Sequence, residues 1–254
     1  MKIQGMLAAT VGLALPLLAC QILAEQAQAA EIKVLASTAV KTTLEELGPQ
    51  FAKATGNKVD LTFAPAAVLK ERIDQGTAFD VAILTTPIID GLAGTGKVDT
   101  ARSAIAHSGI GVAIHKGASR PDITTKEAFK HALLNAKSVG FTAAGATGAY
   151  LKTLFEKLGI AEELKPKLKL LPGATGEAVA SGEVEIGMTQ ISEILPYAGA
   201  ELVGPLPPDI QSYTHFSAAA ASASKDADVA RAFIKFLGAP EALAVIKAKG
   251  MEPG

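Results

Sequence analysis

The strongest constraint on the fold is a repeat of short apolar strands and amphipathic helices in the first third of the chain. A strand that begins at Ile32 is followed by a helix that ends at Gly56. A strand at 59–63 leads to a second helix, and a buried strand at 80–84 leads to a third helix that opens at Thr85. Apolar residues alternate in the strands and recur at helical spacing between them. Strands that alternate with helices predict a parallel sheet with right-handed crossovers.

The middle of the chain has strands and helices of its own, and the end of the chain returns to the first unit. A long strand at 108–115 and a strand at 213–221 connect the two parts. The remaining expected elements are helices near 125–136, 150–159, 177–181, 228–237 and 240–249, and strands at 139–142 and 186–189. The Gly-Pro-Leu-Pro-Pro segment at 204–208 is predicted to be part of the return crossover.

The N-terminus has the pattern of an export signal. Lys2 precedes an apolar run from Met6 to Leu18, and Ala27-Gln28-Ala29 is a small-x-small cleavage pattern. We therefore expect residues 1–29 to be a cleaved signal peptide and the mature protein to be periplasmic. A membrane anchor is the alternative, which the short apolar run disfavours. A second alternative is lipoprotein processing at Cys20, the only cysteine.

Composition excludes several classes of function. The 254 residues carry a formal net charge of −1 and no Trp, so we expect no nucleic-acid partner. Without Cys20, the mature domain has no cysteine for a disulfide or a thiolate site. The four histidines lack the spacing of metal ligands, and no P-loop, dinucleotide fingerprint or nucleophile elbow occurs. We expect no metal site and no cofactor.

Small residues follow several of the predicted strands, at the point where a helix begins. In open α/β sheets, ligands bind at the carboxyl ends of strands, beside helix N-termini whose free N–H groups favour an anion. Any single Ser or Thr there could instead only cap its helix, but the recurrence after successive strands favours a shared site. The candidate ligand-binding residues at these helix starts are Ser37, Thr38, Ala39, Ala66, Ala67, Thr85, Thr142 and Thr147.

Four further residues are candidates because of their positions. Lys41, one turn into the first helix, is the candidate catalytic base, with a solvated surface lysine as the alternative. Gln190, after the strand at 186–189, is a candidate ligand-binding donor, with a water-satisfied loop residue as the alternative. His107 and His215, near the crossovers, are further candidates for a base.

Several segments together resemble the periplasmic molybdate-binding family of ABC importers. The order and spacing of these segments carry the resemblance over most of the mature chain: Val34-Leu35-Ala36-Ser37, Gly56-Asn57-Lys58-Val59, Leu69-Lys70-Glu71-Arg72-Ile73-Asp74-Gln75-Gly76, Phe79-Asp80-Val81-Ala82-Ile83-Leu84 and Gly187-Met188-Thr189-Gln190. The resemblance implies the type II periplasmic-binding-protein fold, with two α/β lobes and a central cleft. Lobe one would comprise 31–112 plus 214–254, and lobe two 113–213. We expect a monomer without a membrane span, with a small anionic ligand and an ABC permease as partners.

The sequence departs from this family at the residues that hold the oxyanion. Molybdate binders of the family present a serine hydroxyl at the start of each of the first two helices, whereas the corresponding residues here are Ala39 and Ala66 or Ala67. The family's tyrosine after the late strand is replaced by Gln190. Each donor lost from a dry site costs about 1–3 kcal/mol if it is not replaced. We therefore expect the ligand to be an organic acid rather than molybdate.

The segments 189–196 and 203–207 are similar to those of a branch that includes bacterial aconitate isomerase, an enzyme built on this binding-protein fold. The favoured hypothesis is a periplasmic solute-binding protein of an ABC importer that captures a small organic anion. The alternative is an isomerase that interconverts cis- and trans-aconitate by an allylic proton shift. A scaffold without a transport role, such as a chemoreceptor partner, remains a third reading, because fold alone does not determine function.

Overall fold

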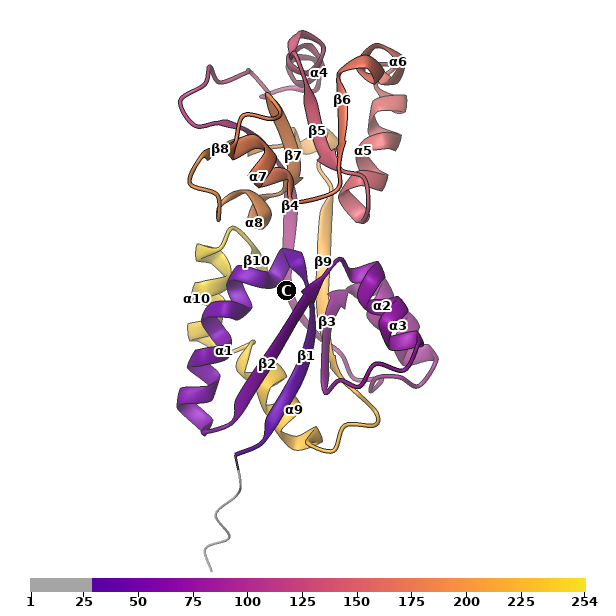
Figure 1. Ribbon diagram of the computed structural model, residues 1–254, viewed down its shortest axis with the longest axis vertical. Coiled ribbons are helices and arrows are strands. Elements are labelled where there is room, and N and C mark those ends of the chain that lie inside the picture. The colour runs from indigo at the N-terminus through magenta and orange to yellow at the C-terminus, as the bar shows by residue number, and fades with distance from the viewer. Residues whose placement is uncertain (1–28) are drawn as a thin grey trace, which may run out of the picture.

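A computed structural model describes residues 29–254 and has the expected architecture of two α/β lobes (Figure 1). Two long antiparallel strands, β4 (Ser103–His115) and β9 (Tyr213–Ala220), connect the lobes. The predicted signal segment lies outside the described residues except for Ala29, and Cys20 lies outside them as well. Within residues 29–254, no helix has the length and apolar character needed to cross a membrane.

Lobe one is built on a mixed sheet in the order β2-β1-β3-β9-β4. The first three strands are parallel, as the strand–helix repeat predicts, and β9 is antiparallel to β3. The strands other than β4 and β9 are β1 (Glu31–Ser37), β2 (Lys58–Ala64), β3 (Val81–Thr85) and β10 (Glu252–Pro253), which pairs with β4. The carboxyl ends of β1, β2 and β3 therefore lie at one edge of this sheet.

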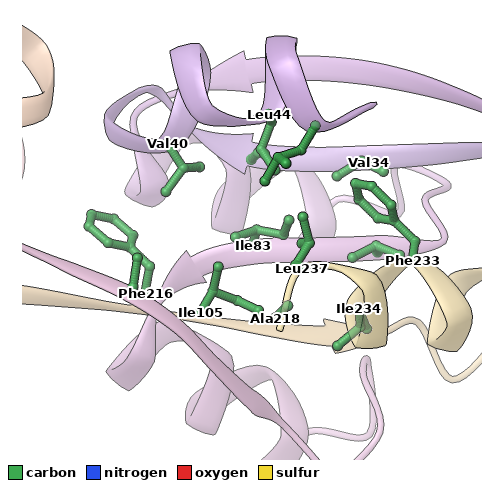
Figure 2. Close-up of a cluster of buried hydrophobic side chains, with 14 of the residues drawn as sticks. Val34, Val40, Leu44, Ile83, Ile105, Phe216, Ala218, Phe233, Ile234 and Leu237 are labelled. Carbon is green, nitrogen blue, oxygen red and sulfur yellow. The ribbon is translucent and has the colours of Figure 1, made fainter. Parts of the chain in front are cut away.

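Helices cover both faces of the lobe-one sheet. One face packs against α1 (Lys41–Thr55), α9 (Ala227–Phe236) and α10 (Pro240–Ala248). Figure 2 shows this core, in which Leu44 of α1 and Phe233 of α9 approach strand residues such as Val34. The other face packs against α2 (Ala66–Asp74) and α3 (Thr86–Gly94). A short 3-10 turn, η1 (Thr38–Val40), precedes α1.

Lobe two has a second sheet in the order β4-β7-β5-β6, with β8 also paired to β4. Its strands besides β4 are β5 (Val139–Thr142), β6 (Leu168–Leu171), β7 (Ile186–Gln190) and β8 (Ala200–Pro205). Its helices are α4 (Lys126–Asn135), α5 (Ala146–Lys157), α6 (Ala161–Leu164), α7 (Thr175–Ala180) and α8 (Ile191–Ile194), with 3-10 turns η2 (Lys165–Lys167) and η3 (Pro208–Ile210). A separate apolar core fills this lobe.

The change from one lobe to the other occurs inside β4. Residues 103–109 of this strand pair with β9 in the lobe-one sheet, and residues 110–115 pair with β7 and β8 in the lobe-two sheet. We place the junction of the lobes at this point of β4. The limits 31–112 plus 214–254 and 113–213 stay a prediction.

Most expected elements are present, with differences at short or irregular segments. The strand expected at 108–115 begins earlier, at Ser103, because its first residues pair with β9. Gln190 is the last residue of β7 rather than a residue after it. Gly204 and Pro205 belong to β8, an edge strand that ends at the proline, where no further backbone donor is needed. Sequence periodicity did not indicate α8, which has only four residues.

Candidate functional site

A cavity of about 620 Å³ lies between the lobes. We call it the interlobe cavity. Both lobes line it through the starts of their helices and the loops that lead into them. Its lining includes Ser37, Thr38, Ala66, Ala67, Thr85 and Ile88 of lobe one and Thr142, Gly145, Ala146, Thr147, Thr189, Gln190 and Glu193 of lobe two. A separate cavity of about 550 Å³, within lobe two near His131, contains none of the predicted site residues.

Small residues at three helix starts form most of the lobe-one wall. Ser37 ends β1 and is only 6% exposed, and its side chain does not cap the turn it precedes. Ala66 is the first residue of α2, and Pro65 before it has no capping side chain. Thr85 precedes α3, and its hydroxyl likewise does not cap that helix. The backbone N–H groups at these helix starts therefore have no side-chain acceptor and are available to an anion.

On the lobe-two side, two glycines set the start of α5. Gly145 has a φ of +95°, which a residue with a side chain adopts only with strain. A Cβ on Gly148 would lie 2.5 Å from the carbonyl oxygen of Thr142. The first turn of α5 thus packs directly on the loop after β5, and Thr147 in this turn faces the cavity.

The hydroxyl of Thr142 is already used within lobe two. It donates to the carbonyl oxygen of Gly173 at 2.8 Å and lies 3.2 Å from the hydroxyl of Thr175. Because a hydroxyl has one hydrogen to donate, Thr142 can only accept a further hydrogen bond in this arrangement. Its side chain connects β5 to the loop before α7 and is not a free donor to a ligand.

A polar cluster at the end of β7 completes the lobe-two wall. Gln190 is 7% exposed, and its Oε1 is enclosed without a hydrogen-bond partner in the described part of the chain. Glu193 of α8 accepts a hydrogen bond from Thr189 at 2.6 Å. It also accepts one at 3.2 Å from Thr38, across the cavity. Among residues 29–254, Glu193 is the only ionisable side chain that lines this cavity.

Glu193 is the residue that the sequence reasoning missed. It lies in the segment 189–196 that indicated the similarity to the isomerase branch, four residues after Thr189. A Thr and a Glu four residues apart face each other when a helical turn forms between them. The spacing was therefore present, but α8 is too short to be recognised from apolar periodicity.

Four predicted residues do not line the interlobe cavity: Ala39, Lys41, His107 and His215. Ala39 is 2% exposed and packs in the lobe-one core, because η1 turns its side chain inward. The side chain of Lys41 is 52% exposed, and its Nζ lies 3.7 Å from the carboxylate of Glu45. Its role as a base stays a prediction without a contact to the cavity. The other eight predicted ligand-binding residues line it.

A second pocket of about 440 Å³ adjoins the cavity beside the connecting strands. We call it the hinge pocket, and it shares Thr85, Ala146 and Thr147 with the interlobe cavity. His215 lines it and stacks on His107 with 5.0 Å between ring centroids. His107 in turn lies 3.1 Å from the carboxylate of Glu252, so it is held outside the pocket lining.

No group of three or more His, Cys, Asp and Glu side chains in residues 29–254 is arranged to hold a metal ion. The polar groups that line the two pockets are hydroxyls, backbone N–H groups, the amide of Gln190, the carboxylate of Glu193 and the imidazole of His215.

Comparison with known proteins gives a consistent picture. Residues 32–252 match the family model described as bacterial extracellular solute-binding protein. An aconitate isomerase from a Pseudomonas species is 31% identical over 230 residues, which is 87% of each chain. A molybdate-binding protein ModA from Azotobacter vinelandii is 29% identical over 262 residues, 94% of this chain and 95% of the other. The structure of an A. vinelandii periplasmic molybdate-binding protein superposes with a TM-score of 0.74 and 19% identity, covering 88% of this chain and 99% of that chain.

Proposed function

This chain belongs to the family of bacterial extracellular solute-binding proteins and has the type II fold of the molybdate binders, and from this premise we propose that it captures a small organic acid in the interlobe cavity. It would act in the periplasm, as a monomer, and deliver the acid to an ABC permease. The cleaved signal at 1–29 is the sequence basis for the location.

One observation carries the proposal: free donors from both lobes face one cavity, and the serines expected of a molybdate site are absent. The lobe-one wall contributes Ser37 and Thr85, and the lobe-two wall contributes Thr147. At the start of α2, however, the wall consists of Ala66 and Ala67, which have no hydroxyl to donate.

The size of the cavity also favours an organic acid as the ligand. A volume of about 620 Å³ lies in the range of pockets that hold small organic molecules. A single tetrahedral oxyanion would leave most of this space to water. An acid with two or three carboxylates could instead place one carboxylate at each group of helix starts, where N–H groups and the helix dipole favour negative charge.

Thermal-shift and calorimetric titrations test this proposal directly. We expect trans-aconitate, or a related polycarboxylate, to raise the melting temperature of the full chain, because a ligand that binds only the folded state stabilises it. Molybdate, tungstate and sulfate should give little shift at the same concentration. A clear molybdate shift with no response to organic acids contradicts the proposal.

An isomerase is the second candidate, favoured by the 31% identical aconitate isomerase and by His215. The reaction would move one proton: a base removes it from the methylene beside the double bond, and the same proton returns to the other end of the allylic system. Of the three bases considered from the sequence, His215 lines the pocket that adjoins the interlobe cavity, whereas Lys41 and His107 line neither pocket.

Proton NMR of trans-aconitate incubated with the protein separates the two functions. Appearance of the cis isomer at a rate proportional to protein concentration supports the isomerase. If His215 is the base, H215N should lower the rate by at least about 100-fold, while H131N in the remote lobe-two cavity should leave it unchanged. Saturable binding without conversion over hours supports the binding function and rejects the isomerase.

A further inference from the structure

The interlobe cavity combines a site for an acid with a negative side chain. Glu193 lines it, and neither Lys, Arg nor His does so within the described part of the chain. The carboxylate is half-buried and is held by hydroxyls of both lobes, Thr189 at 2.6 Å and Thr38 at 3.2 Å. These bonds fix its position, but each contributes only a neutral donor and no positive charge.

A bound anion would therefore meet a charge of its own sign that no cationic side chain in the cavity lining neutralises. Two like charges a few ångströms apart repel strongly in a site that excludes water. Pairs of carboxyl groups in proteins avoid this by holding one proton between them. An acid that binds beside Glu193 can do the same, provided that one of its carboxylates or Glu193 takes up a proton.

Gln190 is an independent sign that this wall is suited to a proton-bearing ligand. The residue is 93% buried, lines the cavity, and has an Oε1 without a partner in the described residues. An enclosed acceptor without a donor is costly. A ligand that carries a hydrogen, or a rotation of the amide as the ligand enters, would relieve this cost.

We propose that the bound acid and Glu193 share one proton, which is taken up from solvent as the acid enters the interlobe cavity. This inference depends on the proposed function, and it adds the protonation state in which the acid is bound. It makes Glu193 a specificity determinant: acids that can retain or accept one proton are favoured, and oxyanions that stay fully ionised are disfavoured.

The other charged groups around α8 do not offer an equivalent site for this proton. Burial, and then the charges of Glu177 and Glu193, raise the pKa of Tyr197, so its phenol is already protonated near neutral pH. Glu201 of β8 is paired with Arg120 at 2.6 Å. Lys41, which follows η1, faces Glu45 instead. The parts of β7 and of β4 over 110–114 that pack against α8 carry no charged side chain.

Calorimetry of the full chain with trans-aconitate in two buffers of different ionisation enthalpy, at one pH near neutrality, tests the proposal. The difference in observed heat gives the number of protons taken up for each ligand bound. We expect about one for the wild type, so that affinity falls about tenfold for each unit of rising pH. E193Q should take up none and show a flatter pH profile. E177Q removes an exposed carboxylate of lobe two that does not line the cavity, and it should behave as the wild type.

The outcomes separate this inference from the function on which it depends. If trans-aconitate and related acids do not bind the wild type, the proposed function is wrong and the inference with it. If they bind without proton uptake, or if E193Q takes up the same proton as the wild type, only the inference is wrong. The wild-type buffer comparison is informative even if E193Q does not fold.

Discussion

The two walls of the interlobe cavity differ in what their polar groups can do. On the lobe-one wall, Ser37 and Thr85 precede helices without capping them, and their hydroxyls are free to donate. On the lobe-two wall, Thr142 donates to Gly173 and Thr189 donates to Glu193, so these hydroxyls are already engaged. Apart from Thr38, which donates to Glu193, lobe one thus presents free donors to a ligand. Lobe two adds one such donor, Thr147, but most of its wall is a network that ends in a carboxylate.

This difference indicates that the two lobes have different roles in ligand binding. Free N–H and hydroxyl donors attract any anion, because they stabilise negative charge without selecting its shape. A carboxylate and an unpartnered amide oxygen discriminate between ligands, because they favour only ligands that bring a hydrogen to donate. We infer that lobe one supplies most of the affinity and that lobe two supplies the specificity.

The largest expected effects test whether the two lobes are equally well packed. Phe233 in lobe one packs on Phe51 with 5.1 Å between ring centroids, and Phe155 in lobe two packs on Phe141 at 5.9 Å. Both residues are at most 2% exposed. F233A and F155A should each lower the free energy of unfolding by about 3–5 kcal/mol. Urea unfolding followed by circular dichroism measures the change.

The shape of these unfolding curves bears on the comparison as well. If the lobes unfold as one unit, both variants shift a single transition. Two separate transitions, with only one moved in each variant, would show that the lobes are independent in stability. A loss below 1 kcal/mol in either variant contradicts the tight packing described for that lobe.

The next effect concerns the free and the engaged hydroxyls. S37A and T85A each remove a donor that we expect to meet the ligand's charge, at about 1.5–3 kcal/mol or roughly 10- to 100-fold in affinity. T142A removes a hydroxyl of the same kind that donates inside lobe two. It should lower stability by about 1 kcal/mol and leave affinity nearly unchanged. Calorimetry with trans-aconitate gives all three affinities. Equal losses of affinity in all three variants would contradict the distinction between free hydroxyls on the lobe-one wall and engaged hydroxyls on the lobe-two wall.

A glycine pair gives a smaller test of how rigidly lobe two holds its wall. A Cβ at Gly148 would lie 2.5 Å from a backbone oxygen that cannot move without displacing the loop after β5, so G148A should cost about 1–3 kcal/mol of stability and weaken binding. Gly91 in α3 of lobe one has open space around it. G91A should be neutral or slightly stabilising, by up to about 1 kcal/mol. Thermal unfolding compares the two, and a tolerated G148A contradicts the close packing of α5.

The sequence was informative where periodicity and sheet geometry act together. The strand–helix repeat predicted the parallel part of lobe one, and the carboxyl ends of its strands necessarily meet at one edge, which is why Ser37, Ala66 and Thr85 line one cavity. Ala39 was placed there as well, but the 3-10 turn before α1 rotates it into the core. Local backbone geometry of this kind is not encoded in hydrophobic periodicity.

Glu193 could not be identified from the sequence for a related reason. Its neighbour across the cavity, Thr38, is 155 residues away in the chain, and only the packing of α8 against η1 brings the two together. The engagement of Thr142 with Gly173 likewise depends on a contact between loops of different strands. Sequence pattern indicates which residues reach a site, but not which of them already have partners.

The smallest predicted effect lies at the far edge of lobe two and should leave both walls unchanged. Arg120 donates to Glu201 at 2.6 Å, and Gly117 N–H lies 3.4 Å from the same carboxylate. The hydrogen bond from Arg120, followed by that from Gly117, lowers the pKa of Glu201 below its ordinary value of 4.5. A carboxylate with a lowered folded-state pKa stabilises the fold above its unfolded pKa, and this contribution disappears as the pH falls through the folded-state pKa.

R120M should therefore melt slightly below the wild type at pH 7, and the two melting-temperature curves should converge in acid. E201Q has no group to titrate at this position, so its curve should likewise meet that of the wild type as Glu201 becomes protonated. Thermal melts across this pH range measure the difference, and trans-aconitate affinity at pH 7 serves as the control, because neither residue lines the cavity. A change in affinity in R120M would mean that the edge and the wall of lobe two are coupled, and the contrast between the walls would then be a property of the whole lobe.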